Sequence, residues 1–310
     1  MQKVIGGIAA VIQAIPSTVE EERVKPLSLL IEFVERDVNA CIELMNTTPV
    51  KAQEVGNAVS IGTRALKCLS SMGKGLQIPD EVPVDTDAKD SVVSRFWREG
   101  NGALLQRRVL HILQILSNSM KWHGDVIEAI CDMLRTGYKE SKSGLFVFRP
   151  VVTVEFVLSC TIDTPRLDYV LETASAMLSR QSHESELDMQ YAASSFLHHL
   201  VGIIGAMGDN PSSDPEVASS SIALANKMIP RYVTCMTKVP NIDKLFNFAL
   251  MGLQAPETMP KREAATFWMG SSEKRVWLKK LMLARGSKAT NQMVMDFWID
   301  CRGAQYTYAS

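Results

Sequence analysis

The chain has 310 residues, with 33 basic and 34 acidic side chains and 46% hydrophobic residues. This balance gives no net attraction to nucleic acid or to a membrane surface and argues against direct binding to either. The hydrophobic share excludes a disordered chain, and the length suits two or three compact domains or one extended array.

The first predicted element is a helix over residues 4–15. Lys3 followed by an apolar run also resembles a short signal peptide, but Gln13 interrupts the run and no small-residue cleavage site follows. The apolar residues at helical spacing, which mark one predicted face, are Val4, Ile8, Val11, Ile12 and Ile15. No run reaches the ~18 apolar residues of a transmembrane span, so the sequence predicts no membrane insertion.

Almost all of the remaining chain is predicted to be helical. The predicted ranges are 26–45, 51–72, 103–118, 124–137, 149–161, 166–180, 186–207, 215–236, 241–254, 260–269, 274–285 and 289–301. Pro26 suits the first position of its helix. The one β-like stretch, residues 147–157, contains Pro150 and is flanked by helices. The sequence therefore predicts an all-α fold.

The connections between these helices are short, apart from residues 78–90 and residues 208–215. No low-complexity linker divides the chain, so residues 1–310 are predicted to form a single segment. Helical hairpins start near residues 104, 147, 187 and 241, at roughly 40-residue spacing, with the interval from 187 to 241 stretched by the connection 208–215. This period predicts a right-handed α-solenoid of about six HEAT-type antiparallel helix pairs.

Residues 258–269 read T-M-P-K-R-E-A-A-T-F-W-M and are typical of the start of a HEAT helix. Its alanines allow a neighbouring helix to approach, and the aromatic pair Phe267 and Trp268 fills the seam. Core packing of this pair is the favoured interpretation, and contact with a ligand is the alternative.

No set of residues with recognisable catalytic or metal-binding spacing is found. The six cysteines contain no pair within four residues, so the sequence predicts reduced, buried thiols rather than zinc sites or a redox motif. His198 and His199 are adjacent and point about 100° apart on a helix, so they cannot share one metal. Residues 71–75, S-M-G-K-G, lack the spacing of a phosphate loop. We therefore predict a protein that is not an enzyme, with no cofactor.

Two charged segments are candidate partner-binding sites. The acidic loop 78–90 carries Asp80, Glu81, Asp85 and Asp87 and would suit a basic partner, although a solvated loop is the simpler interpretation. Residues 261–288 contain eight basic and two acidic side chains. On the predicted helix 274–285, Arg275, Lys279 and Lys280 lie opposite an apolar arc, where a solvated face is again the simpler interpretation.

Four segments together resemble the C-terminal part of the importin-β (karyopherin-β) family of nuclear transport receptors, in its importin-thirteen and transportin-like branch. They are F-V-E-R-D-V at 33–38, A-L-K-C-L-S-S-M-G-K-G-L-Q at 65–77, P-K-R-E-A-A-T-F-W at 260–268 and D-F-W-I-D-C-R-G at 296–303. The resemblance implies a HEAT-repeat fold and shuttling between cytoplasm and nucleus. It also implies binding to cargo proteins and to phenylalanine-glycine nucleoporins, and control by the GTPase Ran.

Ran binding in this family rests mainly on N-terminal repeats, which we expect this chain to lack. No residue here matches a specific Ran, cargo or nucleoporin contact of the family. A different helical-repeat scaffold or adaptor, acting in trafficking or signalling, is the alternative function.

Overall fold

The computed structural model describes residues 1–15, 20–46, 52–77, 96–97, 99–138, 144–179, 186–236 and 238–269. Within these ranges the chain forms helices joined by turns and contains no strand, which confirms the predicted all-α fold. The chain divides into two compact units. Unit 1 comprises Met1–Thr153 and Asp163–His183, and unit 2 comprises Val154–Ile162 and Glu184–Ser310.

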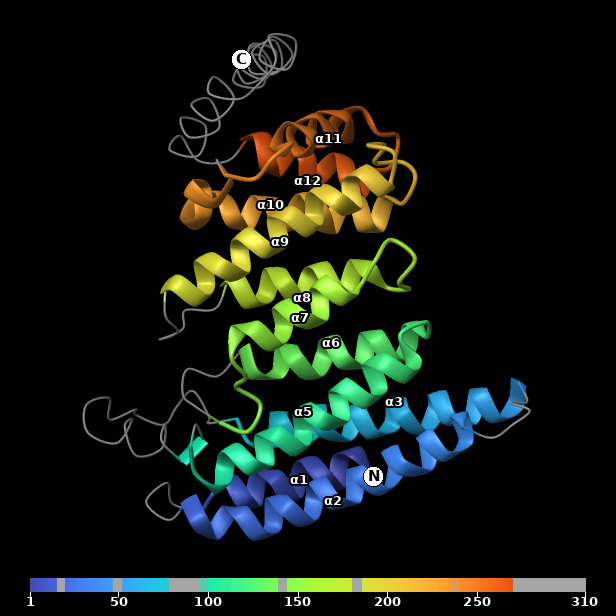
Figure 1. Cartoon of the computed structure of the whole chain (residues 1–310), viewed down its shortest axis with the longest axis vertical. Helices are drawn as coiled ribbons and strands as arrows, with labels where there is room; N and C mark the ends of the chain where they lie inside the picture. The colour runs from blue at the N-terminus through green and yellow to red at the C-terminus, as the bar shows by residue number, and fades with distance from the viewer. Residues whose placement is uncertain are drawn as a thin grey trace, which may run out of the picture. The chain divides into compact units, whose positions relative to one another are not determined.

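The helices are labelled in Figure 1 and divide between the two units. Unit 1 contains α1 (Gln2–Gln13), α2 (Glu20–Met45), α3 (Ala52–Gly75), α5 (Asn101–Met120), α6 (Gly124–Tyr138) and α8 (Leu167–Ser179). Unit 2 contains α9 (Glu186–Ala206), α10 (Pro215–Met236), α11 (Ile242–Gln254) and α12 (Thr258–Met269). Helix α7 (Pro150–Ser159) begins in unit 1 and ends in unit 2.

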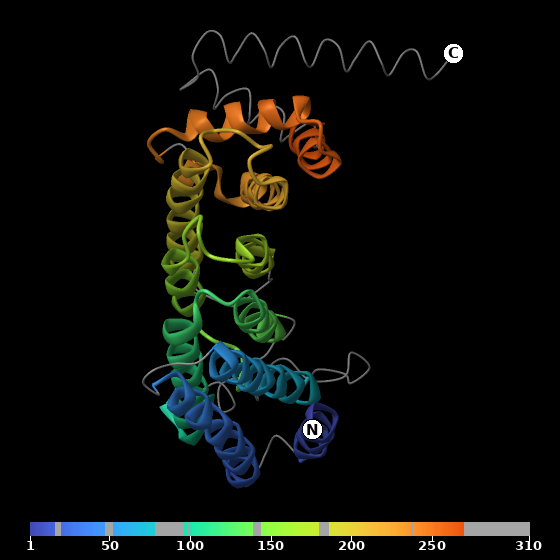
Figure 2. The same ribbon diagram turned by 90° about the vertical axis from the view of Figure 1, so that its right-hand side faces the viewer.

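Unit 1 contains two rows of parallel helices. Helix α2 packs beside α5, and the pairs Glu21–Asn101 and Glu35–Arg108 show that both helices run in the same direction. The second row consists of α3, α6 and α8, and α6 and α8 lie one above the other in Figure 2. Because α2 also packs on α3 and α5 on α6, consecutive helices pair across the two rows.

Arginine–carboxylate pairs fix the register between neighbouring helices of unit 1. Arg108 donates to both carboxylate oxygens of Glu35 at 2.8 and 2.6 Å and to the Ser28 hydroxyl at 2.6 Å. Arg64 on α3 makes the same two-pronged contact with Asp37 on α2, at 3.0 and 2.9 Å. Paired hydrogen bonds of this kind are directional, so each one specifies a single alignment of its two helices.

The hydrogen bonds from Arg108 hold the pKa of the Glu35 carboxyl below its usual value. Glu35 therefore contributes stability above its unfolded pKa, and this contribution is lost as the pH falls through the folded pKa.

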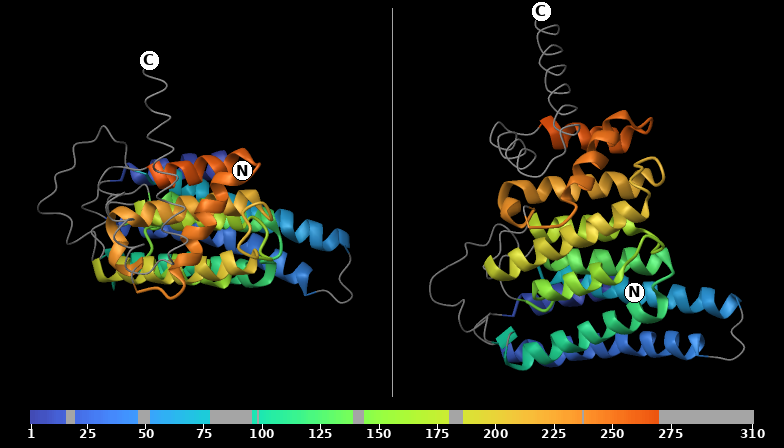
Figure 3. Two further views of the ribbon diagram at one scale, coloured as in Figure 1. Left: turned by 90° about the horizontal axis from the view of Figure 1, so that it is seen from above. Right: turned by 45° about the horizontal axis from the view of Figure 1, so that its top comes forward.

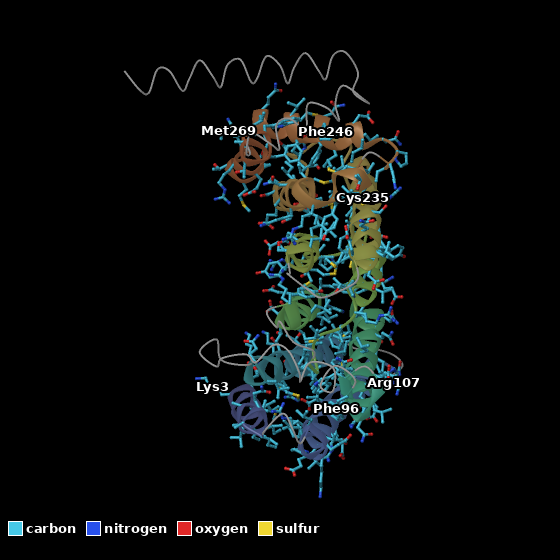
Figure 4. All side chains as sticks on the ribbon, turned by 90° about the vertical axis from the view of Figure 1, so that its left-hand side faces the viewer. Lys3, Phe96, Arg107, Cys235, Phe246 and Met269 are labelled. Atoms are coloured by element: carbon cyan, nitrogen blue, oxygen red, sulfur yellow. The ribbon has the colours of Figure 1, made fainter. Side chains whose placement is uncertain are left out.

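The segment 258–269 packs into the core of unit 2, as its sequence predicted. Phe267 and Trp268 are both 0% exposed, and their rings lie 6.2 and 6.3 Å from the ring of Phe246 on α11. The small residues Gly252 on α11 and Ala264 on α12 allow these two helices to approach closely. A Cβ added to Gly252 would lie only 3.1 Å from the Ala264 Cβ. Figure 4 labels Phe246 among the packed side chains of this unit. Core packing of the aromatic pair is confirmed.

The predicted helix boundaries agree with the structure to within three residues at most positions. The predicted hairpin starts near 104, 147, 187 and 241 correspond to α5, α7, α9 and α11, which begin at Asn101, Pro150, Glu186 and Ile242. The predicted helices 274–285 and 289–301 lie outside the described residues.

Two predictions for the N-terminal helices were wrong. Helix α2 begins at Glu20, so Pro26 lies inside the helix rather than at its first position. The buried face of α1 is formed by Ile5, Ala9 and Ile12, and of the predicted stripe only Ile12 belongs to it. Of that stripe, Val4, Ile8 and Val11 are 63%, 43% and 72% exposed.

The connection 208–215 forms a hydrogen-bonded turn between α9 and α10. Gly208 has a positive φ of 67°, and the amides of Gly208 and Asp209 donate to the carbonyls of Gly205 and Ile204. This is the Schellman pattern of a helix C-terminus, in which glycine takes the left-handed position. Asp214 then caps α10, because its carboxylate accepts from the Val217 amide at 3.1 Å, and Pro215 is the first residue of the helix. The other long connection, 78–90, lies outside the described residues.

The cysteines in the described ranges are buried, as predicted, and none of them forms a disulfide with another. They are Cys41, Cys68, Cys131, Cys160 and Cys235, and Cys301 lies outside the described residues. Burial raises the pKa of the Cys41 thiol to about 11, so this thiol is protonated at neutral pH. Among the helices of the described ranges, none has a stretch long and apolar enough to cross a bilayer.

Candidate functional site

The partner-binding residues predicted from charge all lie outside the described residues. These are Asp80, Glu81, Asp85 and Asp87 in the acidic loop, and Arg275, Lys279 and Lys280 in the basic segment. The structure neither brings them together nor separates them, so both predictions stay predictions.

The candidate site of the described residues is a surface groove in unit 2, between α9 and the start of α11. Its volume is about 340 Å³. The lining residues are His198, Val201, Gly202, Gly205, Val239, Pro240, Asn241 and Lys244. Figure 3 shows the helices of unit 2 from two further directions. The groove is therefore built by two helices that pack together and by the turn that precedes α11.

Two glycines of α9 leave the floor of the groove open. A Cβ added to Gly202 would meet no atom within 4 Å, and one added to Gly205 would lie 3.6 Å from the Lys244 Nζ. Glycine inside a helix is unfavourable by about 0.5–1 kcal/mol relative to alanine. Here the absence of side chains at Gly202 and Gly205 creates the depression. Neither position has the positive φ that would require glycine.

Lys244 gives the groove a positive charge that is only weakly compensated. Its ammonium nitrogen lies 3.6 Å from a carboxylate oxygen of Asp209, which is longer than a normal hydrogen bond. The two side chains are 41% and 44% exposed, so solvent screens the pair and it contributes little to stability.

His198 and Asn241 add polar groups to the same groove. The His198 Nδ1 lies 2.8 Å from the Ser194 carbonyl oxygen, so this nitrogen carries the proton and donates it to the carbonyl. The other ring nitrogen, Nε2, is then left as a hydrogen-bond acceptor. Asn241 precedes α11 in a left-handed conformation with φ of 58°, and its side chain makes no capping hydrogen bond. Both side chains therefore keep polar atoms that a ligand could use.

The neighbouring His199 lies partly buried on another side of α9. Burial lowers the pKa of its imidazole, against a smaller opposing effect of a hydrogen bond to the Cys160 backbone. Its Nε2 is buried without a hydrogen-bond partner. The two adjacent histidines point in different directions, as predicted, and share no site.

The lowered pKa of His199 predicts a pH dependence of stability. Below about pH 6.5 the unfolded chain binds a proton that the folded chain resists, so the free energy of unfolding falls as the pH falls. Urea denaturation between pH 8 and pH 5 should show this loss in the wild type and a smaller loss in His199→Leu. His198→Gln, a change at the exposed neighbour, is the control, and an equal slope in His199→Leu and the wild type would contradict the prediction.

No cluster of three histidine, cysteine, aspartate or glutamate side chains in the described part of the chain is placed to hold a metal ion. Acidic side chains in unit 1 instead pair with arginines: Glu128 on α6 contacts Arg166, the residue before α8, at 2.8 Å, and Asp168 in the first turn of α8 holds the same arginine locally at 3.2 Å. These carboxylates serve packing between α6 and α8.

The groove was not predicted from the sequence. One signal was present, because Gly202 and Gly205 lie three positions apart inside a predicted helix, where glycine is disfavoured. The partners of these glycines, Val239 to Lys244, are more than 30 positions away, and only the fold brings them to α9.

Comparison with models of known protein families and with curated proteins finds no match to this chain. The resemblance to the importin-β family therefore remains an expectation from the four segments described above.

Proposed function

We propose that residues 1–310 form one segment of a right-handed HEAT-type α-solenoid, the C-terminal part of a nuclear transport receptor. In this proposal the protein is not an enzyme and uses no cofactor. It binds cargo proteins and phenylalanine-glycine nucleoporins, shuttles between cytoplasm and nucleus, and responds to Ran through N-terminal repeats outside this chain.

The observation that carries the proposal is the arrangement of parallel helix rows in unit 1. The contacts between α6 and the start of α8 show how far apart in sequence neighbouring helices of one row lie. Arg135 donates to Thr173 and Arg166 donates to Glu128, and the two residues of each pair are 38 positions apart. An offset near 40 residues is typical of HEAT repeats. Stacked pairs leave one face of each helix in solvent, and such arrays usually act by binding other proteins along these faces.

The resemblance of four segments supports the more specific part of the proposal. Three of these segments lie at packing seams of the described structure, and residues 65–77 are the part of α3 that packs on α6 and α1. Residues 33–38 contain Glu35 and Asp37, which pair with Arg108 and Arg64, and residues 260–268 contain the buried Phe267 and Trp268.

A binding assay with the purified chain tests the proposed function. The immobilised chain should retain a phenylalanine-glycine repeat domain and should not retain the same domain with every phenylalanine replaced by serine. Ran loaded with GTP should bind this chain weakly or not at all. Equal retention of the two repeat domains would contradict the proposal.

A helical-repeat scaffold or adaptor in trafficking or signalling is the alternative function. The helix rows of unit 1 support this alternative as well as they support a nuclear transport receptor, because the fold alone does not specify a partner. It becomes the better explanation if the chain fails to discriminate the two repeat domains and stays outside the nucleus when expressed as a fluorescent fusion.

A further inference from the structure

The groove of unit 2 combines an apolar wall with polar groups, two of which, the Lys244 ammonium and the Asn241 amide, are hydrogen-bond donors, while His198 offers Nε2 as an acceptor. The wall is formed by Val201, Val239 and Pro240, and the polar groups come from His198, Asn241 and Lys244. Binding sites commonly have this composition, in which apolar surface provides affinity and a few converging polar groups select the ligand.

The unused donors favour a ligand that accepts hydrogen bonds and carries negative charge. At 3.6 Å from Asp209, the Lys244 ammonium makes no hydrogen bond of normal length to that carboxylate. The Asn241 amide makes no capping bond to its helix. A carboxylate is the acceptor that suits an ammonium best, because charge-assisted hydrogen bonds are about twice as strong as neutral ones.

The floor of the groove indicates how large the ligand is and how it lies. Gly202 and Gly205 are both exposed, so a chain can pass over them without ending there. The volume of about 340 Å³ is at the lower end of the range for ligand pockets. It accommodates one or two side chains, not a folded domain.

We infer that this groove binds a short peptide segment of a partner protein, in which an aspartate or glutamate stands next to an aliphatic residue. The carboxylate pairs with Lys244 and the Asn241 amide, and the aliphatic side chain lies over Gly202 against Val201 and Pro240. This inference deepens the proposed binding of cargo and rests on it, since it names the chemistry of one contact.

Two variants separate the groove from the rest of the protein. Gly202→Leu fills the groove, and because a Cβ there meets nothing within 4 Å, the variant should fold as the wild type does. Lys244→Glu reverses the charge that selects the carboxylate. Their matched controls are Gly56→Leu on α3, where a Cβ also meets nothing within 4 Å, and Lys227→Glu at an exposed position of α10.

A random dodecapeptide display library, selected on the full chain and counter-selected on Gly202→Leu, tests the inference. Enriched peptides should carry aspartate or glutamate next to an aliphatic residue. A synthetic copy of the best peptide, followed by fluorescence anisotropy, should bind Gly202→Leu and Lys244→Glu at least about tenfold more weakly than the wild type, as expected for loss of a hydrogen bond to a charged group. The two controls should bind within about twofold of the wild type, because both lie outside the groove.

Three results would overturn the inference: no peptide that depends on Gly202, enrichment of basic or uncharged peptides, or equal binding to Lys244→Glu and the wild type. The phenylalanine-glycine repeat domain is measured on the same proteins. If that domain binds the chain while no acidic peptide does, the inference fails and the proposed function stands. If acidic peptides bind the groove and the repeat domain does not bind, the proposed nuclear transport function fails and the peptide site stands.

Discussion

Replacing Phe267 with alanine is expected to lower the free energy of unfolding of unit 2 by about 3–5 kcal/mol, the usual cost of truncating a buried aromatic side chain. Phe267 is 0% exposed and meets the Trp268 ring at 5.0 Å and the Phe246 ring at 6.2 Å. Removing the ring leaves a cavity between α11 and α12 that the surrounding side chains fill only in part. Urea denaturation followed by circular dichroism measures the loss, and hydrogen exchange over α10 to α12 locates it.

The same variant separates core packing from a nucleoporin pocket. If Phe267 instead lined a pocket for nucleoporin phenylalanines, Phe267→Ala would weaken binding to phenylalanine-glycine repeats and leave the free energy of unfolding almost unchanged. Met269→Ala is the control on the same helix, because Met269 is 58% exposed, and its change should stay within about 0.5 kcal/mol. An unchanged denaturation midpoint in Phe267→Ala would refute the packing role.

Helical periodicity was a sufficient guide to most of the described fold. Helices such as α6, predicted at 124–137 and found at Gly124–Tyr138, carry a single apolar stripe between clear breakers. In these cases local sequence and tertiary packing favour the same boundaries, so a local pattern predicts them well.

Helix α1 shows where periodicity fails. Its sequence is apolar on almost every side, so hydrophobicity alone does not identify the buried face. The packed face carries Gly6 and Ala9 beside Ile5 and Ile12, and α3 approaches closely there, since a Cβ added to Gly6 would lie 3.2 Å from the Ser71 carbonyl oxygen on α3. The close contact between Gly6 and the backbone of α3 is therefore made in place of burying Val4 and Val11.

The start of α2 depends on a contact between helices that no local pattern contains. Arg23 is 8% exposed and donates to the carbonyl oxygens of Gln13 and Ile15 at the end of α1. This contact and the strong helix formers of residues 20–25 extend the helix before Pro26. The proline removes one backbone donor inside the helix, and the helix continues without it.

Replacing Gly137 with alanine is expected to destabilise unit 1 by about 3 kcal/mol or more, the upper range for overpacking. A Cβ at this position of α6 would lie 2.7 Å from the Phe146 carbonyl carbon, and the carbonyl oxygen is closer still. Helix propensity alone predicts the opposite sign, since alanine in a helix is favoured over glycine by about 0.5–1 kcal/mol. The clash decides the outcome because its partner is backbone, which has no rotamer to change.

The segment around Phe146 is also held from other sides, so it cannot retreat from the new methyl group. Gln106 donates to the Gly144 carbonyl oxygen at 2.6 Å, and the Phe146 ring lies 3.2 Å from a Cβ added to Gly73 on α3. Gly56→Ala is the matched control in the same unit, because a Cβ there meets nothing within 4 Å, and it should leave stability equal or slightly higher. Urea denaturation of both variants checks the pair. If Gly137→Ala were as stable as Gly56→Ala, the close contact between α6 and residue 146 would not exist in solution.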